Sequence, residues 1–216
     1  MTIAAIWRYP VKSMAGERLD SIPLDANGLM GDRVVQVYDR RGRLVTARKY
    51  PRLLRLKATL GSDGEPVVDG FPWDSGEAAD RVAAAVEPGA RLQRFDGPER
   101  FDILPLLVCT DGAVRLFKRD VRRLRPNLVI DGAGETAERG WPGALLRLPD
   151  AEIRLADLRA RCVMTTYDPD TIEQDHDILR DIVRRFGGRL CLNASATRIG
   201  QIREGDSVEI ETATGS

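Results

Sequence analysis

The stretch RARCVMTTYDPDT, residues 159–171, places Cys162 after two arginines and ahead of a threonine pair and an Asp-Pro-Asp-Thr turn. A cysteine thiolate is a nucleophile and a good ligand for soft metal centres, and the neutral thiol is much less so. Arg159 and Arg161 precede the cysteine closely, and nearby cations favour the thiolate. Cys162 is therefore the cysteine whose position most needs a chemical explanation.

A second group of residues could hold a phosphate. The segment YPVKSMAGE interrupts an apolar strand at Pro10 and presents Lys12 and Ser13 ahead of Gly16. A lysine, a hydroxyl and exposed backbone amides form a reasonable phosphate cradle, although the spacing is not that of a P-loop. The same residues also suit an ordinary turn at the end of a strand, so both interpretations stay open.

Two further turns present polar side chains at strand entrances. In GLMGDR, two glycines shape a turn ahead of Asp32 and Arg33. In RPN, the proline pushes the residue before it towards an extended conformation, so that Arg125 and Asn127 should be fixed at the start of a strand. The second motif is also what a simple connector from a helix to a strand would look like.

Composition excludes several classes of protein. The 216 residues are 43% hydrophobic and 31% charged, as expected for a globular chain with a buried core. No segment approaches the ~18 apolar residues of a membrane span, and the N-terminal apolar run is too short for a signal peptide, so we expect a cytoplasmic protein. The net charge is zero, and the densest basic stretch, residues 115–127, contains one aromatic residue, which argues against nucleic-acid binding.

Arginine dominates the basic residues, since only four of the 33 are lysine. This bias reflects either the codon preference of a genome or a use for the forked donors of arginine, which suit phosphate.

The other two cysteines have a different setting from Cys162. Three cysteines without a CxxC pair, together with a single histidine, make a disulfide framework and a zinc site poor expectations. Cys109 and Cys191 lie within apolar strand patterns, so we expect them to be buried structural cysteines. We expect His176 to lie at the surface, in a loop or a helix cap.

The pattern along the chain is mostly short strands separated by turns, with a few helices. We predict hairpins at residues 33–49, 53–69 and 144–155, helices at 75–86, 111–123 and 176–186, and single strands near 104–109, 127–132 and 202–211. A boundary near Gly97 is plausible, which gives domains of residues 1–97 and 98–216. The sum is a β-rich α+β architecture, with a barrel-like core and a few helices.

Taken in order, the segments IWRYPVKSM, GDR, LVTARKYPRL, LRPNLVI, RCVMTTYDPDT and REGDSV resemble the MOSC family. The resemblance runs from about Ile3 to Ile210, and it is to the members that include the mitochondrial amidoxime reducing component. It implies an N-terminal β-barrel-like domain followed by a MOSC β-barrel. It also implies a molybdenum-molybdopterin cofactor enclosed between the two parts.

The resemblance assigns roles to particular residues. Cys162 would be the molybdenum ligand and the catalytic thiolate, in agreement with the preference of soft sulfur donors for such a metal. The residues that would hold the pterin and its phosphate are Lys12, Ser13, Arg33, Arg125, Asn127 and Arg161. The implied activity is reduction of small N-hydroxylated or N-oxygenated molecules, with electrons from a separate protein of iron-sulfur, flavin or cytochrome type.

Some positions depart from the family pattern. Ile103 and Leu104 stand where we place a Thr-Ser pair of the relatives, and Ile172 replaces a common glycine. These departures keep an alternative open, in which the protein carries the cofactor or a persulfide sulfur without reductase turnover. Asp168 and Asp170 could line the substrate side, but Asp168 with Pro169 also makes a turn, and we favour the turn. Arg189 could hold an anion.

Overall fold

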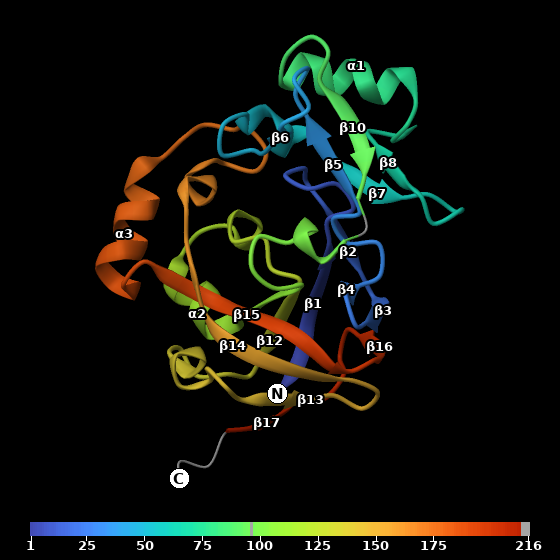
Figure 1. The fold of residues 1–216 in the computed structure, drawn as a ribbon. Helices are drawn as coiled ribbons and strands as arrows, with labels where there is room; N and C mark the ends of the chain where they lie inside the picture. The colour runs from blue at the N-terminus through green and yellow to red at the C-terminus, as the bar shows by residue number, and fades with distance from the viewer. Residues whose placement is uncertain (96, 213–216) are drawn as a thin grey trace.

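The computed structural model describes residues 1–95 and 97–212, and it has the β-rich α+β architecture that the sequence predicts. Its largest sheet has eight strands in the order β17-β13-β14-β15-β11-β12-β1-β2 (Figure 1). These strands are β1 (Thr2–Arg8), β2 (Glu17–Leu19), β11 (Leu106–Thr110), β12 (Leu128–Asp131), β13 (Leu145–Arg147), β14 (Glu152–Ala160), β15 (Arg189–Arg198) and β17 (Glu209–Glu211).

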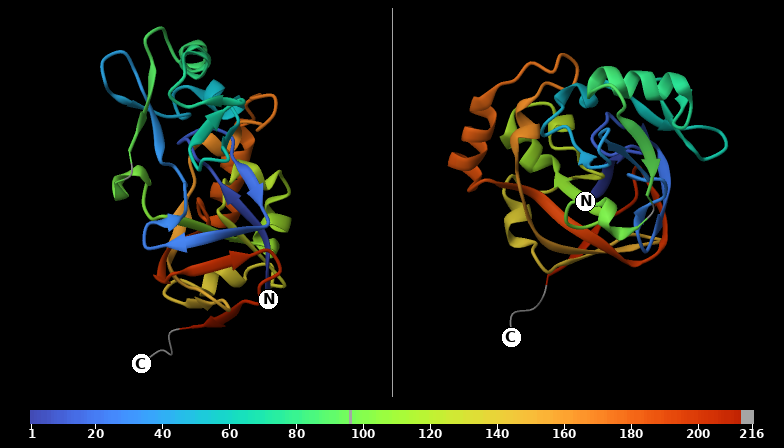
Figure 2. Two further views of the ribbon diagram at one scale, coloured as in Figure 1. Left: turned by 90° about the vertical axis from the view of Figure 1, so that its right-hand side faces the viewer. Right: turned by 45° about the horizontal axis from the view of Figure 1, so that its top comes forward.

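Three small sheets, each of three strands, complete the described β-structure, in the orders β10-β5-β6, β16-β3-β4 and β7-β8-β9. Their strands are β3 (Ser21–Asp25), β4 (Gly28–Leu29), β5 (Val35–Tyr38), β6 (Leu44–Val45), β7 (Ala58–Leu60), β8 (Pro66–Val68), β9 (Phe71–Pro72), β10 (Arg91–Arg94) and β16 (Gly200–Arg203). Helix α1 (Gly76–Ala85) lies with β5, β6 and β10 at one end of the molecule, and β13 and β17 lie at the other (Figures 1 and 2).

Strand pairing joins the first and second halves of the chain. Strand β1 pairs with β12 in an antiparallel arrangement, with Ile6 opposite Leu128, and β3 pairs with β16. A buried apolar cluster built from Val11 to Ala90 is also covered by Met164 and Tyr167 from the second half. The boundary near Gly97 stays a prediction, but both halves contribute to the same sheets and to the same core.

The helices follow their capping residues. Helix α1 starts after Ser75, whose Oγ accepts a hydrogen bond from the Ala78 N–H at 3.2 Å. Helix α3 (His176–Phe186) ends at Gly187, which has the left-handed φ of 61° that favours glycine. His176 is exposed at the start of α3, as expected. Among the described residues, no helix is long and apolar enough to cross a membrane.

Two element predictions were wrong in extent. Helix α2 (Asp111–Phe117) begins after Thr110 as expected but ends at Phe117, because Lys118 turns to a left-handed φ of 55°. A separate 3-10 turn, η3 (Val121–Arg123), then leads to β12. The first strand predicted for the second hairpin begins instead as a 3-10 helix, η1 (Pro51–Arg55). The strand itself, β7, starts at Ala58. Pro51 starts that turn without needing a backbone donor there.

The largest correction concerns the cysteines. Cys109 and Cys191 are fully buried as expected, but they form a disulfide with their Cα atoms 4.4 Å apart. Strands β11 and β15 are antiparallel with Val108 opposite Leu192, so the next position along the ladder brings the two cysteines face to face. Because they are separated by 82 residues in sequence, their spacing gave no sign of this pairing.

Candidate functional site

The seven residues that the resemblance singles out all line one cavity of about 110 Å³. They are Lys12, Ser13, Arg33, Arg125, Asn127, Arg161 and Cys162. They come from four segments: the turn after β1, the turn before β5, the connector between η3 and β12, and the end of β14. The fold therefore brings together residues that are spread over most of the sequence.

Three of these residues share an uncommon backbone conformation. Ser13, Arg33 and Arg125 have φ values of 73°, 56° and 55°, in the left-handed region that side chains other than glycine seldom adopt. The extended conformation predicted for Arg125 from the following proline is therefore wrong. Backbone hydrogen bonds hold these turns, including Arg33 N to Tyr9 O at 2.8 Å and Arg125 N to Arg122 O at 3.2 Å. Such strained positions concentrate at functional sites.

A buried carboxylate, Asp32, organises one wall of the cavity. Its Oδ1 accepts the Tyr9 N–H at 2.7 Å, and its Oδ2 pairs with Arg33 and accepts Asn127 Nδ2 at 3.2 Å. Asn127 Oδ1 in turn accepts the Leu107 N–H at 3.1 Å. Asp32 thus fixes the side chains of Arg33 and Asn127, a positioning role that we had not assigned to it from the sequence.

Arg125 and Arg161 are enclosed cations without a carboxylate partner among the described residues. Each donates instead to a backbone carbonyl, Arg125 Nη1 to Met14 O and Arg161 Nη2 to Leu124 O, both at 2.7 Å. Burial lowers the pKa of each guanidinium to about 10, so both remain protonated at neutral pH. Arg161 Nε is buried and has no hydrogen-bond partner. Two desolvated cations and an unsatisfied donor make this wall receptive to an anion.

The ring of Tyr9 packs against the guanidinium of Arg125. The Arg125 guanidinium carbon lies 4.2 Å from the centroid of the Tyr9 ring, and the Tyr9 hydroxyl donates to Pro126 O at 3.1 Å. Burial raises the pKa of Tyr9 to about 12, and the ring stays neutral beneath the cation. This cation–π contact holds Arg125 in place without cancelling its charge.

Sequence reasoning missed two residues on the same cavity, Asp102 and Arg48. Asp102, on the segment between the two halves, forms ion pairs with Lys12, Arg48 and Arg159. Arg159 had been noted only for its closeness to Cys162, and Arg48 and Asp102 had no motif to mark them. Only the fold brings these distant positions together.

The charge of the lining is strongly positive. Its basic residues are Lys12, Arg33, Arg48, Arg123, Arg125, Arg159 and Arg161. The carboxylates that pair with them are Asp102 in the lining, Asp32 behind Arg33 and Asp168 beside Arg123. Among the described residues the cations outnumber these carboxylates by seven to three, so an anionic ligand would be electrostatically favoured.

Cys162 is the free cysteine of the chain and is half-buried. It directly follows β14 and precedes the 3-10 turn η5 (Val163–Thr166). The Thr165 N–H and Oγ1 both donate to Cys162 O, at 3.1 and 2.9 Å. These bonds fix the backbone of Cys162, which lines the same cavity as the two arginines without carboxylate partners.

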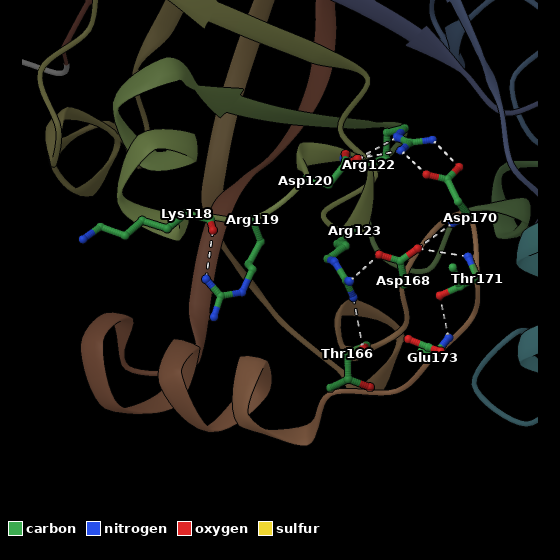
Figure 3. A network of polar contacts seen from close by, with 10 residues as sticks. All are labelled: Lys118, Arg119, Asp120, Arg122, Arg123, Thr166, Asp168, Asp170, Thr171 and Glu173. Carbon is green, nitrogen blue, oxygen red and sulfur yellow. Dashed lines mark hydrogen bonds and ion pairs between the residues drawn. The ribbon is translucent and has the colours of Figure 1, made fainter.

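The loop after Cys162 is tied to η3 by two arginines (Figure 3). Arg122 bridges Asp120 and Asp170, and Arg123 donates to Asp168 Oδ2 at 2.8 Å and to Thr166 O at 3.1 Å. Asp168 Oδ1 also accepts the N–H groups of the residues at 170 and 171, both at 3.0 Å, which makes the turn that we favoured. The loop is therefore anchored next to the connector that carries Arg125 and Asn127.

Three other positions lie differently. Leu104 lines the cavity, whereas Ile103 is exposed. Arg189 is exposed and donates to Leu158 O at 3.2 Å, outside the cavity lining. Its backbone pairs with Ala160 at the end of β14, next to the cavity, but its side chain is not part of the lining that the described residues form.

Comparison with known proteins agrees with this architecture. Residues 1–71 match the MOSC N-terminal beta barrel domain, and residues 111–209 match the MOSC domain. The chain belongs to the MOSC family. The solved structure of the YuaD protein from Bacillus subtilis has the same fold at a TM-score of 0.51, with 13% sequence identity over 99% of this chain and 96% of that one.

Several curated relatives of this MOSC protein have names that indicate chemistry. Mitochondrial amidoxime-reducing component 1 of Mus musculus is 26% identical over 248 residues, which cover 88% of this chain and 72% of that protein. Mitochondrial amidoxime reducing component 2 of Macaca fascicularis is 25% identical over 280 residues, with coverages of 96% and 82%. A molybdenum cofactor sulfurase of Anopheles gambiae is 25% identical over 84% of this chain and 32% of that protein.

Proposed function

We propose that this MOSC protein is a molybdenum-cofactor-dependent oxidoreductase that removes oxygen from small N-hydroxylated or N-oxygenated compounds. The observation that carries the proposal is one cavity that combines the free thiol of Cys162 with two enclosed arginines lacking carboxylate partners in the described chain. A thiolate suits a soft metal, and a strongly basic wall suits a phosphate. The names of the amidoxime-reducing relatives supply the reaction class.

The residues present fit the cofactor chemically. Arg161 Nε is an unsatisfied buried donor close in sequence to Cys162, Arg125 offers charge-assisted hydrogen bonds to the pterin, and Lys12 offers them to its phosphate monoester. Ser13 adds a hydroxyl, and Asn127 is held in a fixed orientation by Asp32. Cys162 would ligate the metal. When bound, the cofactor would supply a redox centre that accepts the oxygen atom of the substrate.

The reaction has a definite balance. Reduction of an N-hydroxylated compound replaces an N–OH bond by an N–H bond and releases water, and it consumes two electrons and two protons. A separate donor protein of iron-sulfur, flavin or cytochrome type would supply the electrons. The chain's own contribution is to orient the thiolate, to neutralise the phosphate and to keep the backbone of the Cys162 loop rigid through Arg122 and Arg123.

A second candidate is a carrier that holds the cofactor, or a persulfide on Cys162, without turnover. The similarity to a molybdenum cofactor sulfurase and the free, half-buried thiol favour this candidate. It uses the same cavity, and it differs in needing neither an electron donor nor a substrate.

Metal analysis and turnover together test these candidates. We expect the full chain, made in a host that synthesises the cofactor, to contain about one molybdenum per chain and to show a thiolate-to-metal charge-transfer band. We expect it to reduce an N-hydroxylated amidine with a chemical electron donor. Cys162→Ser should lose both the band and the turnover, because a hydroxyl is a harder and far less acidic donor. Arg119→Ala, at an exposed position outside the cavity, is the control.

Each outcome selects between the candidates. Molybdenum without turnover would favour the carrier, and so would cyanide-releasable sulfur that disappears in Cys162→Ser. Protein without molybdenum and without pterin would overturn both. Full turnover in Cys162→Ser would remove the role given to this sulfur.

A further inference from the structure

Asp102 is the only carboxylate among the described residues that line the Cys162 cavity, and three cations converge on it. Lys12 Nζ lies 2.9 Å from Asp102 Oδ1. Arg48 Nη2 and Arg159 Nη2 lie 3.1 and 3.2 Å from Asp102 Oδ2. Burial opposes the charged form of Asp102, but the three cations prevail and lower its pKa below the ordinary value. Asp102 is thus an anion at physiological pH.

The cations come from both halves of the chain. Lys12 follows β1 and Arg48 follows β6, whereas Arg159 belongs to β14. Asp102 lies between the 3-10 turn η2 (Pro98–Arg100) and β11, on the segment that joins the two halves. The carboxylate therefore occupies the position where an anionic ligand would contact both halves at once.

The segment around Asp102 is firmly held at its ends but exposed between them. Arg100 is buried, and it donates from Nε to Asp32 O and from Nη2 to Asn27 O, both at 3.1 Å. Leu106, in β11, is also buried. Asp102 is partly exposed and Ile103 is exposed between these anchors. A displacement confined to residues 102–104 would leave both anchors in place. The ion pairs that it would break among the described residues are those of Asp102, which a ligand can replace.

The cavity is small compared with typical ligand sites. Its volume is about 110 Å³, whereas pockets for small ligands and cofactors typically measure roughly 300–1,000 Å³. Asp102 and Leu104 form part of its wall, so outward movement of residues 102–104 would enlarge it.

We propose that Asp102 is an internal anion that occupies the subsite of the ligand's phosphate and makes the cavity selective for phosphate dianions. A phosphate monoester has three terminal oxygens and a charge near −2, so it can accept from Lys12, Arg48 and Arg159 together. A carboxylate on a ligand has the same charge and the same two oxygens as Asp102, so its displacement of Asp102 yields no net binding free energy. Only the stronger anion displaces the segment and opens the cavity. The identity of the whole ligand rests on the proposed function, but the phosphate subsite does not.

Calorimetric titration of the full chain with inorganic phosphate at pH 7.5 tests this inference. Asp102→Asn keeps the size of the side chain and removes the competing charge, so phosphate should bind at least about fivefold more tightly, the lower end of a typical coupling between two sites. Acetate should bind to Asp102→Asn and not to the natural chain. Asp102→Glu restores the competing carboxylate and should return phosphate affinity towards that of the natural chain.

The matched control is Asp150→Asn, which removes a carboxylate from an exposed ion pair with Arg203, outside the cavity lining. It should leave phosphate affinity unchanged. Thermal unfolding of each variant would verify that it is folded at the temperature of the titration. Unchanged or weaker phosphate binding by folded Asp102→Asn would overturn the inference, because Asp102 would then organise the cations rather than compete for them.

The two proposals fail in different ways. If Asp102→Asn binds phosphate more tightly but neither protein acquires molybdenum in a cofactor-producing host, the subsite stands and the proposed function falls. If the natural chain acquires molybdenum and Asp102→Asn shows no gain in phosphate affinity, the proposed function stands and the internal anion falls.

Discussion

The disulfide between Cys109 and Cys191 gives a stability prediction with a calculable size. It closes a loop across a sequence separation of 82 residues. For a loop of this length, the chain-entropy relation gives about 4.5 kcal/mol at 25 °C, and typical measured values are about 2–4 kcal/mol. Replacing both residues by alanine should lower the free energy of unfolding by about 2–4 kcal/mol. For a chain of this size, that change corresponds to a fall of roughly 4–16 °C in Tm.

A double-mutant cycle separates the bond from simple packing. Either single variant, Cys109→Ala or Cys191→Ala, already breaks the bond, so each should cost nearly as much as the double variant. Two unpaired cysteines in the same apolar cluster would instead show costs closer to a sum. The assay is thermal unfolding followed by circular dichroism, with thiol titration of the denatured, unreduced protein. One titratable thiol, from Cys162, is expected; three thiols, or additive costs, would refute the reasoning.

Three further outcomes are expected. Arg125→Ala and Lys12→Ala should each lower cofactor retention by an amount equivalent to ~1.5–3 kcal/mol, since each removes a charge-assisted contact. The control, Arg119→Ala, should retain as much cofactor as the natural chain. Equal molybdenum content in all three variants would contradict this expectation. Arg123→Ala should speed proteolysis of the Asp-Pro-Asp-Thr loop, because it removes the hydrogen bonds that join the loop to η3. An unchanged cleavage pattern would show that packing alone holds the loop. Burial raises the pKa of Glu138, so its ionisation lowers the free energy of unfolding as pH rises above the unfolded-state pKa. Glu138→Gln should therefore be more stable than the natural chain at pH 8 but not at pH 4. Urea unfolding at the two pH values measures this difference.

Local signals predicted where several helices begin and end. Ser75, Thr110 and Gly187 cap helices as their types suggest, and the seven residues from the family resemblance line one cavity. These signals lie within a few residues of the features that they control, so a single sequence is enough to read them. The assigned roles of the seven residues remain predictions.

The missed features depend on strand register and on contacts between distant segments. The Cys109–Cys191 bond follows from the pairing of β11 with β15, which no local pattern encodes. The ion pairs of Asp102 join residues from three parts of the chain. Arg125 adopts its left-handed φ although the following proline favours an extended backbone, because the tertiary contact of its guanidinium with Met14 O holds it there.

The pairing of β1 with β12 has a consequence for biosynthesis. Thr2 lies opposite Asp131, so at about 5–20 residues per second the first strand waits roughly 6–26 s before its partner has been made. During that time Ile3 and Ile6, which are fully buried in the finished protein, have no partner strand on that side. Such an apolar strand with an open edge is the kind of nascent segment that chaperones bind and that aggregates when they are scarce. Yield during expression should therefore depend on translation speed and on chaperone supply more than the stability of the finished protein would suggest.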